Sequence, residues 1–206
     1  MHIKTLTKNQ IKDLYNDRLI QDFPPAELKP LPVILDAVDK GIYEGLGLYD
    51  GEEMVGYSCL VKQADNYLVD YLAIFSEKRN SGIGSNLIKL LAGYLDGTGS
   101  VIVEVEDPQY GSNDEDRDLR ARRLSFYLRN GCFDTGVRVR CFGVEFIILK
   151  MGNTEIEKEM CWDIYSSFYK AVLPEGMYDE NIELLGYMNG KSTYRNRRSD
   201  KIHGQI

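Results

Sequence analysis

The segment from Leu72 to Ser85 has the composition of a phosphate-binding loop. An apolar run is followed by a polar stretch over residues 76–81, and then by Gly82 and Gly84 at the start of an amphipathic run. The first N–H groups of a helix have no intrahelical acceptor, and the helix dipole attracts anions to that end. Glycines there let a phosphate approach the backbone. The segment therefore predicts an anion site, although a helix start without a ligand could have the same residues.

Two other phosphate motifs fit this chain poorly. A P-loop requires G-x-x-x-x-G-K-[ST], and the sequence has no such run. A dinucleotide-binding fingerprint requires a third glycine at position 87, where Leu87 stands. Glu104 lies near the position of the acidic residue in that fingerprint, but no second βαβ unit follows. Dinucleotide binding is therefore not expected.

The elements that must position this loop follow from hydrophobic periodicity. Apolar residues at helical spacing predict a first helix that is capped by Thr7 or Asn9 and ends before Pro24, and further helices over residues 33–38, 82–94 and 115–130. β-Branched and alternating runs predict strands over residues 1–5, 43–49, 53–62, 67–75, 100–106, 133–141 and 144–150. This order predicts a mixed α/β fold rather than a repeated βαβ array.

Composition limits the class of protein. The chain has 206 residues and a formal net charge of −7, which argues against general nucleic-acid binding. No apolar run reaches the roughly 20 residues of a membrane span, and no secretory signal pattern begins the sequence. A cytoplasmic location is therefore expected. The two histidines, His2 and His203, lie near the termini, so a Cys/His zinc site and a histidine-dependent triad are not expected. The four cysteines are expected to be reduced and buried.

The chain changes character after residue 150. Apolar residues recur at helical spacing between Ile156 and Val172, and Cys161, Tyr165 and Tyr169 widen the stripe. That face must pack on the core or on a partner. The stretch from 190 to 206 is basic and poor in apolar residues, which predicts a mobile tail. We therefore divide the chain into a domain over residues 1–150 and a helical C-terminal extension over residues 151–206.

Three motifs in order resemble the GNAT N-acetyltransferases. Arg79-x-x-Gly82-x-Gly84, after a strand ending Leu72-Ala73-Ile74, resembles motif A of that family, [RQ]-x-x-G-x-[GA]. The strand Ile102-Val103-Glu104-Val105 is similar to the strand between the family's motifs, and the segment 126–133, Phe-Tyr-Leu-Arg-Asn-Gly-Cys-Phe, resembles its F/L-Y-x-x-x-G-F segment. The resemblance spans about residues 1–150. It implies the GNAT fold, a mixed and mostly antiparallel central sheet flanked by helices.

The resemblance also implies the co-substrate, which in this family is acetyl-CoA, and no metal. Arg79 would lie near its pyrophosphate. The pantetheine arm would lie along Leu72, Ala73 and Ile74. The backbone amides that would hold the pyrophosphate are those of Asn80, Ser81, Gly82, Ile83, Gly84 and Ser85.

The residues are consistent with acetyl transfer to a primary amine. Such an amine has a pKa near 10 and must lose a proton before it attacks a thioester, so a carboxylate can serve as base and a tyrosine can protonate the leaving thiolate. By resemblance, Tyr127 is the candidate acid, although it could be a packed helix aromatic. Glu104 is the candidate base, with Glu106 on the same strand face and Asp70 as further choices. A solvated or salt-bridged strand edge is the alternative for Glu104 and Glu106.

The sequence departs from the family at two points. Arg120 and Arg123 stand where the family usually has Asn and Ala, and residues 104–118 form a longer, acidic stretch. That stretch could attract a small cationic amine, or it could be a solvated loop and helix start. A protein N-terminus or lysine is the alternative acceptor, and a non-catalytic acyl-CoA-binding regulatory module is the alternative function. A homodimer is left open.

Overall fold

The computed structural model describes residues 1–79, 81–152 and 154–188, and within them the strands form one eight-stranded sheet. Its order is β1-β2-β3-β4-β5-β7-β6-β8, and the pairs are antiparallel except for the parallel pair β4–β5. The bounds are β1 His2–Thr5, β2 Tyr43–Asp50, β3 Glu53–Gln63, β4 Asn66–Ile74, β5 Val101–Glu106, β6 Cys132–Cys141, β7 Val144–Met151 and β8 Ile182–Tyr187. The expected mixed, mostly antiparallel sheet is confirmed.

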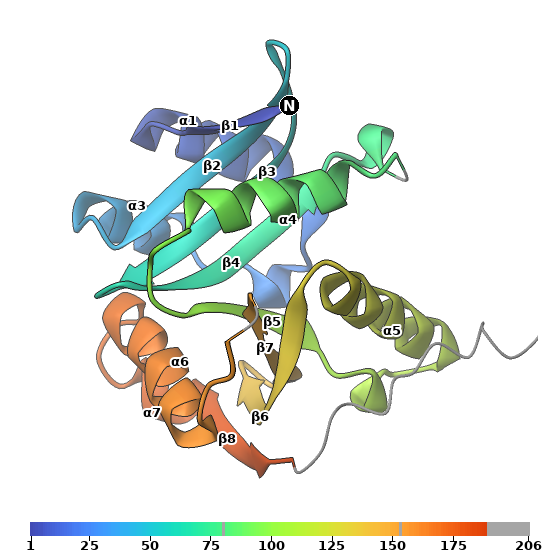
Figure 1. The fold of residues 1–206 in the computed structure, drawn as a ribbon. Coiled ribbons are helices and arrows are strands. Elements are labelled where there is room, and N and C mark those ends of the chain that lie inside the picture. The colour runs from blue at the N-terminus through green and yellow to red at the C-terminus, as the bar shows by residue number, and fades with distance from the viewer. Residues whose placement is uncertain (80, 153, 189–206) are drawn as a thin grey trace, which may run out of the picture.

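The helices connect and cover these strands (Figure 1). The α-helices are α1 Lys8–Leu14, α2 Ile20–Asp22, α3 Leu31–Asp39, α4 Ile83–Tyr94, α5 Asp114–Arg129, α6 Lys158–Val172 and α7 Met177–Asn181. A π-helical segment, η1 Tyr15–Leu19, joins α1 to α2. Short 3₁₀ turns are η2 Pro25–Glu27, η3 Ser76–Lys78 and η4 Pro108–Tyr110.

Two helical layers bury opposite faces of the sheet. On one face α1, α3 and α6 pack with strand residues such as Tyr57, Tyr71 and Ile102. On the other face α4 and α5 pack with residues such as Val69 and Val103. Successive strand side chains point to opposite faces, so a single β-branched strand such as β5 supplies both cores. The four cysteines are free and buried, as expected.

The parallel strands β4 and β5 separate halfway along their length. They pair only from Tyr67 with Val101 to Val69 with Val103. In β4 the register against β3 shifts so that Asp70 is an extra residue between Val69 and Tyr71. Such a bulge bends the strand and increases its local twist. The second half of β4 therefore diverges from β5, and a gap opens between two neighbouring strands of the sheet.

The chain after residue 150 is part of this packing. Helix α6 packs on β3, β4 and β6, so its apolar face covers the core of its own chain. Strand β8 pairs with β6, which adds a strand that periodicity did not predict. The division at residue 150 stays a prediction, and the basic tail lies outside the described residues. Among the described residues, no helix is long and apolar enough to cross a membrane.

Candidate active site

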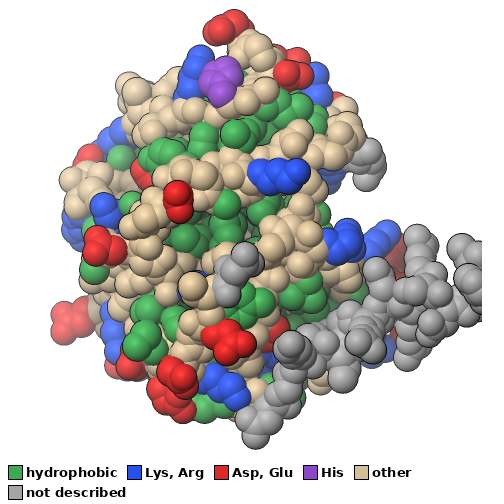
Figure 2. Space-filling model, in the orientation of Figure 1, with side chains coloured by type: hydrophobic (Ala, Val, Ile, Leu, Met, Phe, Trp, Pro, Cys, Tyr) green, Lys and Arg blue, Asp and Glu red, His purple; other side chains and the backbone are tan. Residues whose placement is uncertain are grey.

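A cavity of about 770 Å³ passes through the gap between β4 and β5. At one end Gly82, Gly84 and Tyr127 line it from the layer of α4 and α5. At the other end Lys29 and Tyr169 line it from the opposite layer. The surface between α4 and α5 carries hydrophobic side chains with basic ones beside them (Figure 2). The cavity thus connects an exposed groove with a chamber among buried side chains.

The glycine loop begins α4 with open backbone donors. Gly82 is the N-cap residue in a left-handed conformation with φ +79°, and no side chain caps the helix. The first N–H groups of α4 therefore have no intrahelical acceptor. A Cβ at position 84 would lie 3.2 Å from the Phe126 ring, so this turn packs closely against α5. Ile83, Gly84 and Ser85 line the cavity, and their N–H groups have no acceptor within the helix.

The rest of the loop is held by contacts within the protein. Arg79 Nε donates to the Ile74 carbonyl at 2.9 Å, and Arg79 Nη2 lies 3.1 Å from Asp22 Oδ1. The hydroxyl of Ser81 donates to the Lys78 carbonyl at 2.8 Å. The guanidinium of Arg79 therefore fastens the loop to the end of β4 and to α2. Asn80 lies outside the described residues.

The diverging half of β4 has a free backbone edge beside the cavity. The N–H of Phe75 donates to Val55 of β3 at 3.0 Å. Backbone groups of successive strand residues point to alternate sides. Ala73 therefore points its backbone toward β3, whereas Leu72 and Ile74 point theirs toward the gap, where pairing with β5 has ended. A ligand in the gap can pair with the backbone groups of Leu72 and with the N–H of Ile74, whose carbonyl already accepts from Arg79.

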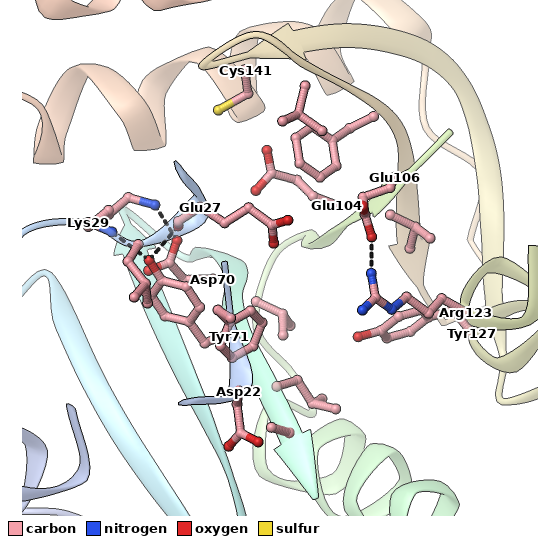
Figure 3. A pocket seen from close by; sticks show the side chains of 18 of the residues that line it. Asp22, Glu27, Lys29, Asp70, Tyr71, Glu104, Glu106, Arg123, Tyr127 and Cys141 are labelled. Atoms are coloured by element: carbon pink, nitrogen blue, oxygen red, sulfur yellow. Dashed lines mark hydrogen bonds and ion pairs between the residues drawn. The ribbon is translucent and has the colours of Figure 1, made fainter. Parts of the chain in front are cut away.

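Glu104 lies at the centre of the chamber (Figure 3). Tyr165 Oη donates to its Oε1 at 2.6 Å, and Tyr169 Oη lies 2.9 Å from Oε1 and 2.8 Å from Oε2. Burial raises the pKa of Glu104, whereas Lys29 and the two hydroxyls lower it and Asp70 raises it. The net direction is upward, which makes this carboxylate a stronger base than a solvated glutamate.

Asp70 is engaged in a buried ion pair beside Glu104. Lys29 Nζ lies 2.5 Å from Asp70 Oδ1, and Tyr43 Oη donates to Oδ2 at 2.8 Å. The side chains of Lys29 and Asp70 are 11% and 1% exposed. Both oxygens of Asp70 are therefore occupied, and the charge of Lys29 is balanced.

The Glu106 carboxylate is paired with two arginines of α5. Arg120 Nε lies 3.5 Å from Glu106 Oε1, and Arg123 Nη1 contacts Oε2. Arg120 also pairs with Asp116 at 3.1 Å. The two arginines that depart from the family pattern thus neutralise Glu106. The salt-bridged alternative describes Glu106, but it does not describe Glu104.

Tyr127 lines the cavity between Glu104 and the glycine loop (Figure 3). Its ring packs edge-on against Phe126, with centroids 5.3 Å apart. Burial and the nearby Cys132 raise its pKa, and Arg123 opposes them. Because its pKa is raised, the hydroxyl is protonated at neutral pH. Within the described part of the chain it has no hydrogen-bond partner, so it is available to a ligand.

The acidic residues that face the chamber are not those that the acidic stretch after Glu106 was expected to supply. Asp114 pairs with Arg117 at 2.8 Å, and the acidic first turn of α5 does not line the cavity. The half-buried Glu27 does line it, and its side chain points into the chamber (Figure 3). No partner for the Glu27 carboxylate occurs among the described residues. Sequence reasoning missed Glu27, Lys29, Tyr165 and Tyr169; only the tyrosines carried a signal, as members of an apolar helical stripe.

Comparison with known proteins identifies the family. The acetyltransferase (GNAT) family model matches residues 9–114, just over half of the chain. The chain belongs to the GNAT acetyltransferase family. It is thus an acyltransferase, as the motifs at Arg79–Gly84 predicted. No curated protein sequence matches it at a significant level. No cluster of side chains able to hold a metal ion occurs among the residues that the structure describes.

Solved structures share the fold at low sequence identity. A protein from Bacteroides thetaiotaomicron assigned to the GNAT family superposes with a TM-score of 0.67 at 19% identity, over 84% of this chain and 98% of that one. The aminoglycoside 6′-N-acetyltransferase from Enterococcus faecium gives 0.54 at 19% identity, over 73% and 96%. An aminoglycoside 6′-N-acetyltransferase complexed with coenzyme A gives 0.52 at 18% identity, over 73% and 96%. These likenesses establish the GNAT fold of the chain.

Proposed function

We propose that this GNAT enzyme transfers an acetyl group from acetyl-CoA to a primary amine in a ternary complex. The observation that carries the proposal is the continuous cavity, which leads from the glycine loop through the gap between β4 and β5 to Glu104. A structure of the same fold was determined with coenzyme A bound, which supports the choice of co-substrate.

The residues at the exposed end fit the pyrophosphate and pantetheine of a coenzyme A. The uncapped start of α4 offers backbone donors, and Gly82 has open space where a side chain would stand. Arg122 lines the same end, is exposed and has no partner among the described residues, so it can balance a phosphate charge. The N–H groups of Leu72 and Ile74 can pair with the amides of the pantetheine arm.

The chemistry then divides between two side chains. Acetyl-CoA supplies the acetyl group as a reactive thioester. Glu104 accepts a proton from the amine, so that the nitrogen lone pair can attack the thioester carbonyl carbon. As the new C–N bond forms, the C–S bond breaks and the electron pair leaves with sulfur, and the nitrogen releases its second proton to solvent to give the neutral amide. Tyr127 donates its proton to that thiolate and recovers one from solvent. Glu106 is the weaker candidate base because Arg120 and Arg123 already pair with it.

The acceptor that suits the chamber is a small amine with a second cationic group. Glu27, Asp70 and Glu104 face the chamber together with Lys29, and Arg123, which also lines the cavity, is paired with Glu106. Because Lys29 and Asp70 balance each other, Glu27 remains to pair with a positive charge. Leu173, Pro174 and Met177 wall this end, which favours a small molecule over a protein N-terminus or lysine.

The test is a screen of diamines, aminoglycosides, monoamines and short peptides with acetyl-CoA, following release of free thiol. We expect amine-dependent release with the dicationic acceptors, and a loss of about 100-fold or more at neutral pH in Glu104→Gln, with recovery as the amine deprotonates unaided at high pH. Glu106→Gln is the matched control and should lose much less. No release with any amine, or equal losses in the two variants, would contradict the proposal.

A further inference from the structure

The Glu104 carboxylate is held by two tyrosines that lie outside the stretch matched by the family model. Tyr165 donates to one oxygen, and the single proton of Tyr169 is shared between both oxygens. Three short contacts from two hydroxyls therefore converge on one carboxylate. A protonated carboxyl would be a donor itself and would force one of these hydroxyls to turn. The arrangement suits the ionised form.

The two tyrosines are rigidly placed. They are four residues apart on α6, so both side chains lie on one face of the helix. Their ring centroids are 5.2 Å apart, and Trp162 stacks on Tyr165 at 5.9 Å. Tyr165 is fully buried and Tyr169 is 4% exposed. Because α6 packs on β3, β4 and β6, the helix fixes the hydroxyls relative to the strand that carries Glu104.

We propose that Tyr165 and Tyr169 are positioning residues, which keep Glu104 ionised and aim its less occupied oxygen, Oε2, at the acceptor amine. The proposal rests on the proposed function, in which Glu104 is the base. Oε1 accepts from both tyrosines, whereas Oε2 shares one proton with Oε1 and keeps a lone pair for the chamber. The helix after residue 150 thereby completes the active site.

The other groups around Glu104 do not replace this role. Lys29 attracts the charge of the Glu104 carboxylate, but Lys29 is paired with Asp70, and the charge of Asp70 repels that of Glu104. Glu27, from η2, adds a second like charge. Cys141, from β6, faces the tyrosines, and burial raises the pKa of its thiol to about 12, so it is neutral at neutral pH. Burial favours the protonated form of Glu104, and the hydroxyl donors oppose it.

The first test is the pH dependence of kcat/KM in Tyr165→Phe and Tyr169→Phe. Loss of a donor destabilises the ionised carboxylate, so the acid limb should move to higher pH by about one unit in each variant, because a hydrogen bond to a charged group is worth roughly one pKa unit. Activity above the new pKa should largely return. Tyr178→Phe is the matched control: its hydroxyl contacts Ser166 at 2.6 Å, and its acid limb should not move.

The second test needs no turnover. Glutamate labelled with ¹³C at the carboxyl carbon reports the titration of Glu104 by NMR, with Glu104→Gln assigning the signal. The same upward shift is expected in both tyrosine variants and is absent from Tyr178→Phe. An unmoved carboxyl titration in a folded Tyr165→Phe or Tyr169→Phe protein would overturn the positioning role. If Glu104→Gln keeps full activity, the proposed base is wrong, whatever the tyrosine variants show.

Discussion

Breaking the ion pair between Lys29 and Asp70 should destabilise the protein strongly. The two side chains are 11% and 1% exposed, and Nζ lies 2.5 Å from Oδ1. Lys29→Met would leave the Asp70 carboxylate buried with only the hydroxyl of Tyr43, which donates at 2.8 Å. Removal of one partner of a buried pair costs about 3–5 kcal/mol. Since Tyr43 still donates a hydrogen bond to one carboxylate oxygen, we expect a loss of unfolding free energy at the lower end of this range, about 3 kcal/mol.

Denaturant unfolding at pH 7 measures this change, and a thermal scan should show a fall of roughly 6–12 °C for a chain of this size. The double variant Lys29→Met/Asp70→Asn removes both charges and should recover part of the loss. Lys40→Met is the matched control, because Lys40 and Asp36 form an exposed pair at 2.6 Å. Its loss should stay within about 0.5 kcal/mol.

The pH dependence of the same coupling gives an independent check. Burial alone lowers the pKa of Lys29, but Asp70, Tyr71 and Glu104 raise it, and the net direction is upward. A raised lysine pKa contributes stability that is fully present below the unfolded value of about 10.4 and is lost only as pH rises above it. The coupling measured by the double-mutant cycle should therefore be constant between about pH 6 and 9. A coupling below about 1 kcal/mol, or a loss in Lys29→Met no larger than in Lys40→Met, would refute the reasoning.

Three further predictions concern the cavity. Gly84→Val should abolish acetyl-CoA binding measured by calorimetry, because the valine side chain would meet the Phe126 ring and block the helix start. Gly93→Ala is the control, because position 93 of α4 has open space for a side chain, and this variant should keep the binding. Unchanged affinity in a folded Gly84→Val protein would contradict the coenzyme site. Tyr127→Phe should lower kcat by about 10²–10⁴-fold with acetyl-CoA affinity kept, and a wild-type kcat would make Tyr127 a packing residue. Glu27→Gln should raise KM for a diamine by about tenfold and leave KM for the matching monoamine unchanged; equal effects would remove Glu27 from acceptor recognition.

The local features of this fold were legible in the sequence because short-range physics sets them. Two glycines after a strand mark the uncapped start of α4, since the left-handed φ at position 82 suits a residue without a Cβ. The alternation in β5 placed Glu104 and Glu106 on one face, because successive strand side chains point to opposite sides. Element order and the family motif then sufficed to predict a GNAT fold, which the structure and the family match confirm.

The environment of each functional side chain was decided by tertiary structure. Glu104 and Glu106 are equivalent in the sequence, yet one accepts from Tyr165 and Tyr169 and the other from arginines of α5. Contacts between residues about 60 positions apart leave no trace in local periodicity, where an apolar stripe with two tyrosines looks like packing. Strand β8 was missed for the same reason: its short sequence becomes a strand because β6 offers an edge to pair with. The helix starts and the strand face on which each side chain lies were therefore determined by local sequence. The charge state and the orientation of each functional side chain depend on which distant elements the folded sheet brings together.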